Sequence, residues 1–125
     1  YVAMLFSSIA GISKCGTYSG SSSAFTVDLG FQPRMIIIKC KTSNRNWIMF
    51  NTITGWAKET MSDPEDATKY LALNDNGGTT IPAVVSGNNV VCYPVSTGVY
   101  FTGIQNSLYG NVNLVGQDYM YFAHA

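Results

Sequence analysis

The side chains that could perform acid–base or nucleophilic chemistry are few in this sequence. A serine or cysteine nucleophile needs a base beside it, and the single histidine is His124, at the second-last position. Glycoside hydrolysis needs two facing carboxylates, but Asp63, Glu65 and Asp66 crowd into one turn, where negative charge at the start of a helix explains them. We therefore interpret His124 as a strand residue and predict no catalytic residue and no enzymatic activity. The remaining carboxylates are Asp28, Glu59, Asp75 and Asp118.

The three cysteines, Cys15, Cys40 and Cys92, are widely separated and form no C-x-x-C pair. Because zinc and iron–sulfur sites need clustered ligands, this spacing disfavours both, and we predict buried free thiols. One disulfide with one free cysteine stays open as an alternative. Residues 74–77 (NDNG) resemble the start of a calcium loop but have no later glutamate, so we interpret them as a hairpin turn. The sequence thus predicts no metal and no cofactor.

Aromatic side chains are the main recognition resource, with eight Tyr, six Phe and two Trp. Sugar-binding sites stack pyranose rings on exposed Trp or Tyr and use amides for the hydroxyl groups. Trp56, Tyr109 and Asn111 fall in segments with loop character, so we select them as candidates for contacting a glycan on a host surface. For Trp56 the alternative is a loop tryptophan that closes the edge of the fold. Trp47 is predicted to lie in the core.

The composition excludes several classes of partner. Seven Lys and Arg balance seven Asp and Glu, so the chain lacks the basic excess of a nucleic-acid binder. The longest strictly aliphatic run covers residues 35–38, far below the roughly 20 residues that span a bilayer, and we predict no membrane insertion. Only 11% of the residues are charged, whereas Ser, Thr, Asn and Gly supply 45 of the 125. A surface this weakly charged favours packing against another copy of the chain.

Short apolar and β-branched runs, separated by Gly, Asn and Pro, follow one another along the chain. We expect strands at residues 1–6, 11–20, 24–29, 34–40, 47–50, 70–73, 90–93, 99–102 and 119–123. The run at 34–40 (RMIIIKC) reads as a central strand, with 47–50 as its hairpin partner. At most one short helical turn is expected, near 63–69. About nine short strands predict an all-β fold, a two-sheet antiparallel β-sandwich that is jelly-roll-like.

The two ends of the sequence resemble each other. Residues 1–7 (YVAMLFS) and 119–125 (YMYFAHA) each begin with Tyr and continue as an apolar strand that ends in a small residue. The similarity indicates a repeat period of about 118 residues, in which residues 1–9 form a terminal strand shared with, or repeated from, a preceding unit. Residues 10–125 then form a single β-sandwich domain, and we expect the chain to be cut from a longer polypeptide.

Six motifs occur along the chain in a fixed order: residues 10–20 (AGISKCGTYSG), 29–39 (LGFQPRMIIIK), 46–56 (NWIMFNTITGW), 70–74 (YLALN), 94–99 (PVSTGV) and 111–125. In turn they resemble the patterns AGxSKxGxYxG, GFQPxxVxIK, NWxxFDTxRGW, YLxLN, PTSTGF and SVNxxGxTYIYxAFA. These patterns belong to a domain widespread in tail-fibre and other appendage proteins of tailed bacteriophages. The resemblance spans essentially the whole chain. Asn51 and Thr54 depart from it, because the family usually has Asp and Arg at these positions.

The resemblance implies a module of a virion appendage, in the extracellular phage particle, more firmly than it implies a biochemical activity, and we expect a non-enzymatic structural and adhesive role. We expect it in a tail fibre or related appendage, with copies of itself or other virion proteins as partners and host-surface polysaccharide as a target. A decoration or coat protein of the virion is the alternative. A third, less favoured reading is a carbohydrate-degrading domain of a tail spike, which would need two carboxylates facing each other across a groove.

Overall fold

A computed structural model of the chain describes residues 3–56, 69–74, 81–82, 90–105 and 112–125. Within them lie β1 (Ser13–Ser19), β2 (Phe25–Asp28), β3 (Met35–Cys40), β4 (Trp47–Asn51), β5 (Lys69–Ala72), β6 (Ile81–Pro82), β7 (Cys92–Val95), β8 (Gly98–Phe101) and β9 (Asp118–His124). They form a six-stranded sheet, in the order β1-β9-β3-β4-β5-β6, and a three-stranded sheet, in the order β2-β8-β7. All strand pairs are antiparallel.

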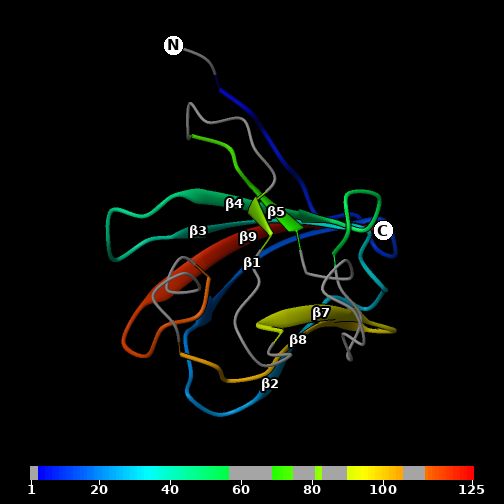
Figure 1. Cartoon of the computed structure of the whole chain (residues 1–125). Coiled ribbons are helices and arrows are strands. Elements are labelled where there is room, and N and C mark those ends of the chain that lie inside the picture. The colour runs from blue at the N-terminus through cyan, green and yellow to red at the C-terminus, as the bar shows by residue number, and fades with distance from the viewer. Residues whose placement is uncertain (1–2, 57–68, 75–80, 83–89, 106–111) are drawn as a thin grey trace.

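The two sheets lie one above the other in Figure 1, which makes the chain a two-layer β-sandwich, as the sequence predicts. The chain starts in the large sheet, crosses to the small one for β2, and returns for β3 to β6. It then forms the β7–β8 hairpin in the small sheet, and β9 closes the large sheet between β1 and β3. The first and last strands therefore lie side by side.

The strand predicted to be central occupies that place. β3 pairs on one side with β4, where Ile38 lies opposite Ile48, and on the other side with β9, where Ile38 lies opposite Tyr121. Its hairpin with β4 is the one expected from the sequence. A strand with neighbours on both edges satisfies its backbone hydrogen-bonding groups within the sheet, and this explains why β3 carries the longest aliphatic run.

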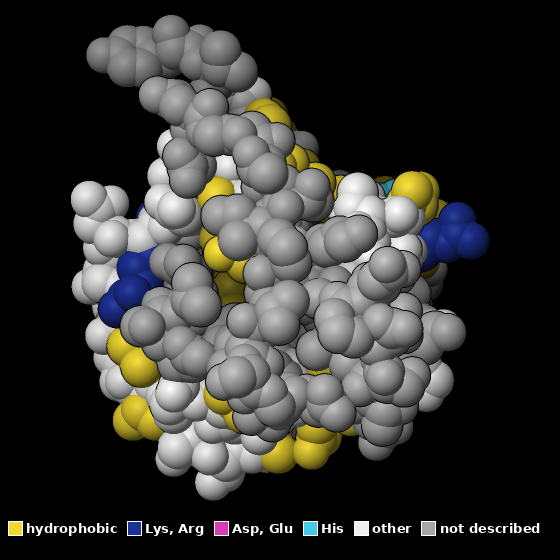
Figure 2. Space-filling view, viewed as in Figure 1, with side chains coloured by type: hydrophobic (Ala, Val, Ile, Leu, Met, Phe, Trp, Pro, Cys, Tyr) yellow, Lys and Arg dark blue, Asp and Glu magenta, His cyan; other side chains and the backbone are white. Residues whose placement is uncertain are grey.

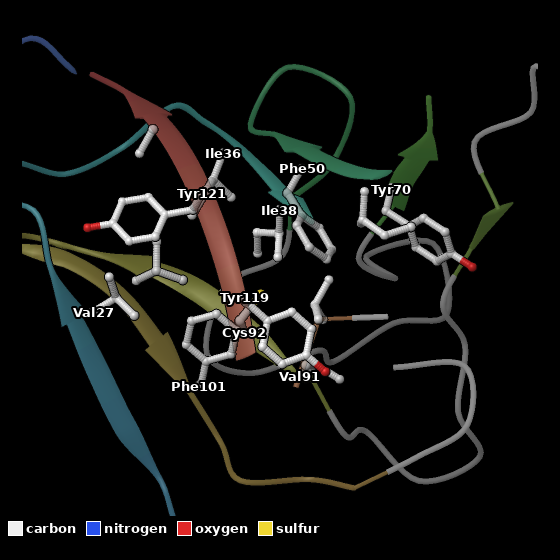
Figure 3. Packing of buried hydrophobic residues seen from close by; sticks show 14 of the residues in the cluster. Val27, Ile36, Ile38, Phe50, Tyr70, Val91, Cys92, Phe101, Tyr119 and Tyr121 are labelled. Atoms are coloured by element: carbon white, nitrogen blue, oxygen red, sulfur yellow. The ribbon is translucent and has the colours of Figure 1, made fainter. Parts of the chain in front are cut away.

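The core fills the space between the two sheets. Figure 3 shows Ile36, Ile38, Tyr119 and Tyr121 of the large sheet and Val27, Cys92 and Phe101 of the small sheet packed together. The rings of Phe25 and Phe101 stack with their centroids 4.8 Å apart, and Tyr18 stacks on Tyr119 at 5.0 Å. These residues alternate with exposed or half-buried neighbours on the same strands, because successive side chains of a strand point to opposite faces.

Two expected elements differ in the structure. The strand expected at residues 1–6 does not form over its described part: residues 3–8 have no strand pairing, and Ile9 makes only an isolated bridge with Ser13. On the N-terminal side of that bridge, the segment lies away from the edge of β1. The ring of Phe6 stacks on the ring of Phe122 of β9, with the two centroids 4.2 Å apart. Conversely, the short edge strand β6 is absent from the sequence prediction.

The helical turn expected near 63–69 falls outside the described residues, apart from Lys69, which begins β5. Within the described ranges, no helix has the length and apolar character required to cross a membrane.

Candidate functional site

The face of the six-stranded sheet that points away from the small sheet, called the outer face below, has an apolar centre and polar ends. On each strand its residues are those between the core positions. The apolar ones are Cys15 on β1, Met35 and Ile37 on β3, Trp47 and Met49 on β4, Leu71 on β5, and Met120 and Phe122 on β9, and the polar ones toward the strand ends and the β1 edge are Ser13, Thr17, Ser19, Lys39, Asn51, Asp118 and His124. Antiparallel sheets with one face in water usually alternate apolar and polar residues. The central strands of this sheet do not, because they carry apolar side chains on both faces.

The segment of residues 3–8, called the arm below, passes over part of the outer face. It runs on the side of the large sheet opposite the small sheet (Figure 1). Besides the Phe6–Phe122 stack, two hydrogen bonds hold it: the Ser13 hydroxyl donates to the Ser7 carbonyl at 2.8 Å, and the Cys15 amide donates to the Ser8 hydroxyl at 3.0 Å. These contacts fix the end of the arm nearest β1.

Between the arm and the outer face lies a cavity of about 500 Å³. Its lining comes from the arm, β1, β3, β4 and β9, and consists of Met4, Phe6, Cys15, Gly16, Ile37, Trp47, Met120, Tyr121 and Phe122. None of these described lining residues is charged. A Cβ at Gly16 would lie 2.6 Å from the hydroxyl oxygen of Tyr121, so a larger residue there would displace the Tyr121 ring.

Two charged side chains at the margin of the outer face, Lys39 and Asp118, form hydrogen bonds within the chain. The ammonium of Lys39 donates to the carbonyl of Arg45, and the carboxylate of Asp118 accepts a hydrogen bond from the Ser19 hydroxyl at 2.7 Å. Figure 2, a side view of the sandwich, shows basic side chains of the described residues at two flanks and no acidic one. The described lining of the cavity has no charged side chain, so the cavity is suited to apolar side chains and offers little to an ion.

Trp56, predicted to be an exposed binding residue, is instead part of the core. Only 5% of its surface is exposed, its indole N–H donates to the carbonyl of Cys92 at 3.1 Å, and its ring stacks on Phe50 at 5.7 Å. The turn after β4 causes this, because the Trp56 amide bonds back to the carbonyl of Asn51 and Gly55 has φ +108°. Tyr109 and Asn111, the other two candidates, lie outside the described residues.

Trp47 shows the opposite error. It was predicted to lie in the core, but its side chain is half-buried on the outer face and lines the cavity. The sequence separates Trp47 and Met49 from Ile48 and Phe50 by alternation, but both pairs are apolar, so it does not tell which pair faces the core. Ile48 and Phe50 are the buried residues of β4, and the two-residue period of a strand then places Trp47 on the opposite face.

The described carboxylates have structural hydrogen bonds. Asp28 accepts from the Gly30 amide at 3.0 Å, which shapes the turn after β2, and Asp118 joins β9 to the end of β1 through Ser19. His124 lies on the last strand, with its Nδ1 2.8 Å from the carbonyl oxygen of Ala125. Among the residues that the structure describes, no group of three or more His, Cys, Asp and Glu is placed to hold a metal ion. The other five carboxylates lie outside those residues.

All three cysteines are free thiols, as predicted, and the alternative of one disulfide does not apply. Cys40 and Cys92 are buried, also as predicted, whereas Cys15 is only half-buried. Burial raises the pKa of Cys92 to about 12. The pKa of the Cys40 thiol lies below its usual value. Burial acts to raise it, but the hydrogen bonds with Ser43 and Thr42 lower it by more. Cys15 is half-buried and is the cysteine that lines the cavity.

Comparison with known proteins gives one match. A family model described as a domain of unknown function (DUF7483) matches residues 1–125. No curated protein and no solved structure matches the chain. The match covers the whole chain but assigns no activity to it.

Proposed function

This chain belongs to the DUF7483 family, and we propose that it is a non-enzymatic structural and adhesive module of a bacteriophage tail fibre or related virion appendage. Its task in this proposal is to assemble with other copies of itself or with other virion proteins. The phage setting is supported by the ordered sequence motifs, and the mode of action by the outer face.

The observation that carries the proposal is the apolar outer face with its cavity. A two-layer sandwich needs apolar residues only between its sheets. Here Ile37, Met120 and Phe122 add apolar surface on the far side of the same strands. Such surface gains stability only when another protein surface covers it, at roughly 25 cal/mol per Å² of apolar area.

The charge of the chain supports the same proposal. Its net charge is zero and only 11% of its residues are charged. Copies of a neutral protein do not repel one another, and an interface with few charges has a small desolvation penalty. A module that stays separate from its copies usually keeps a net charge away from zero.

Adhesion to a host-surface glycan is the second part of the proposal. Trp56 cannot serve, since its indole is buried, so this role rests on Tyr109 and Asn111. The described lining of the cavity includes no side-chain amide or carboxylate for sugar hydroxyl groups. We therefore assign the outer face to assembly and keep glycan contact separate from it.

The mass of the chain in solution tests the proposal. Sedimentation equilibrium from low micromolar to near-millimolar concentration should give masses at integral multiples of 13.6 kDa, rising with concentration. Association through apolar surface should persist in high salt, whereas association through ion pairs weakens there. A chain that remains a 13.6 kDa monomer over the whole range would overturn the proposal.

A further inference from the structure

We infer that the outer face docks a second copy of this chain, and that Leu5 of each copy enters the cavity of the other. The inference rests on the proposed function, and it specifies the surface, the partner and the side chain that makes the contact. It follows from the shape of the arm, the lining of the cavity and the small number of charges around both.

The arm presents apolar side chains in two opposite directions. Met4 and Phe6 line the cavity, while Leu5, between them, is 95% exposed. In an extended segment successive side chains point to opposite sides. Leu5 therefore does not turn into the cavity of its own chain while Met4 and Phe6 stay there, and none of the described residues covers it. We assign its cover to a different molecule.

The cavity favours an apolar occupant. A volume of about 500 Å³ stays empty with the arm in place, and the described lining offers sulfur, methyl and aromatic groups without a charged side chain. An ion or a phosphate would lose hydrogen bonds to water there without a charged partner to replace them. An aliphatic side chain loses none.

A second copy is the partner that fits both features. The exposed Leu5 and the cavity lie on the same side of one chain, so two copies related by a two-fold axis can each donate the side chain and receive the other's. Lys39 and Asp118 lie at the margin of the outer face and carry opposite charges, so neither sign is in excess there to repel an identical surface. The two outer faces would then pack on each other and give β3 and β9 a further layer.

The test compares three variants by sedimentation equilibrium and by their thermal unfolding. Leu5→Glu should keep the fold, because Leu5 makes almost no contact in the single chain, yet it should weaken association about tenfold or more. Met120→Glu, on the floor of the cavity, should do the same. Val115→Glu is the matched control: Val115 is 55% exposed, lies in the turn before β9 beside Gln105 and is outside the cavity. It should associate like the parent chain.

The thiol of Cys15 gives an independent readout, because it lines the cavity whereas Cys40 and Cys92 are buried. In the assembled parent chain, alkylation of Cys15 by iodoacetamide should be slow, and Leu5→Glu should raise its rate several-fold at the same concentration. Cys92 should stay unmodified in both until the chain unfolds.

The outcomes separate the two proposals. If the parent chain assembles but Leu5→Glu and Met120→Glu assemble equally well, another surface is used and only this inference fails. If the parent chain is a monomer throughout, the proposed function fails and this inference with it. If a host polysaccharide added to the monomer protects Cys15, a glycan occupies the cavity and the inference is wrong.

Discussion

The inner and outer faces of the six-stranded sheet carry similar residues but are covered very differently. Ile36 and Ile38 on the inner face are fully buried, whereas Ile37 between them is half-buried on the outer face. The inner face packs against the small sheet, while among the described residues only the arm packs on the outer face. The apolar residues of β3 therefore divide into two sets: one belongs to the folding core, and the other forms the surface that we propose for assembly.

The largest expected effect comes from removing side chain volume on the inner face. Ile38→Ala should lower the free energy of unfolding by about 2–5 kcal/mol, because a fully buried aliphatic side chain leaves a cavity behind. Ile37→Ala, one residue away on the outer face, should cost only about 1 kcal/mol. Urea unfolding of both variants in the Leu5→Glu background measures this without interference from association. Equal losses would show that the two faces contribute alike to folding.

Alkaline pH should also act through the interior. Folding raises the pKa of Cys92 to about 12, and burial likewise raises that of Tyr119 to about 12. The unfolded chain releases these protons near pH 9 and 10, and the folded chain holds them, so stability is complete below pH 9 and falls between pH 9 and 12. One such group lowers stability by about 1.4 kcal/mol per pH unit in that window.

Urea midpoints recorded from pH 8 to pH 11 measure this slope. Cys92→Ala should reduce the slope of stability against pH by about 1.4 kcal/mol per pH unit, which corresponds to one proton, because the thiol that the interior keeps neutral is gone. A parent chain whose stability is constant up to pH 11 would contradict the burial of these groups.

The two tryptophans extend the comparison to single side chains. Trp56→Phe keeps an aromatic ring in the core but leaves the carbonyl of Cys92 without its donor, which should cost about 1–3 kcal/mol. Trp47→Phe on the outer face should cost less than about 0.5 kcal/mol in the monomer. Acrylamide quenching then checks the assignment, because the tryptophan left in Trp47→Phe should be shielded and the one left in Trp56→Phe should be quenched. The reverse order would mean that the two faces are assigned wrongly.

The sequence was sufficient to predict most strands because their signal is local. The alternation in β2 and the aliphatic run of β3 each lie within one strand, and both predictions are confirmed. The burial of Trp56 depends instead on a hydrogen bond to a carbonyl 36 positions away and on a turn that bends the chain inward. No local pattern records such a contact.

The cavity was beyond prediction for the same reason. Its lining joins the arm to β9, at the other end of the chain. The apolar pattern of residues 1–6 predicts a segment that packs on a sheet. It does not distinguish a strand that pairs at the edge of the sheet, which was our prediction, from an arm that contacts its face, which the structure shows for residues 3–8. The stack of Phe6 on Phe122 decides this, and it depends on a residue more than a hundred positions away.

The smallest expected effect is that of Phe6→Ala in the arm, and Phe101→Ala in the core serves as its reference with a large effect. Phe101→Ala should cost about 3–5 kcal/mol, because it empties a fully buried site in the core. Phe6→Ala should leave global stability nearly unchanged and weaken only the attachment of the arm, by about 0.5–1.5 kcal/mol. The amide of Cys15 donates to the Ser8 hydroxyl of the arm, so its hydrogen exchange should quicken several-fold in Phe6→Ala. Ser8→Ala, which removes that acceptor directly, sets the upper limit of the effect. If Phe6→Ala instead lowered global stability as much as Phe101→Ala, the arm would be part of the folding core, and the outer face would not be free to receive a second copy.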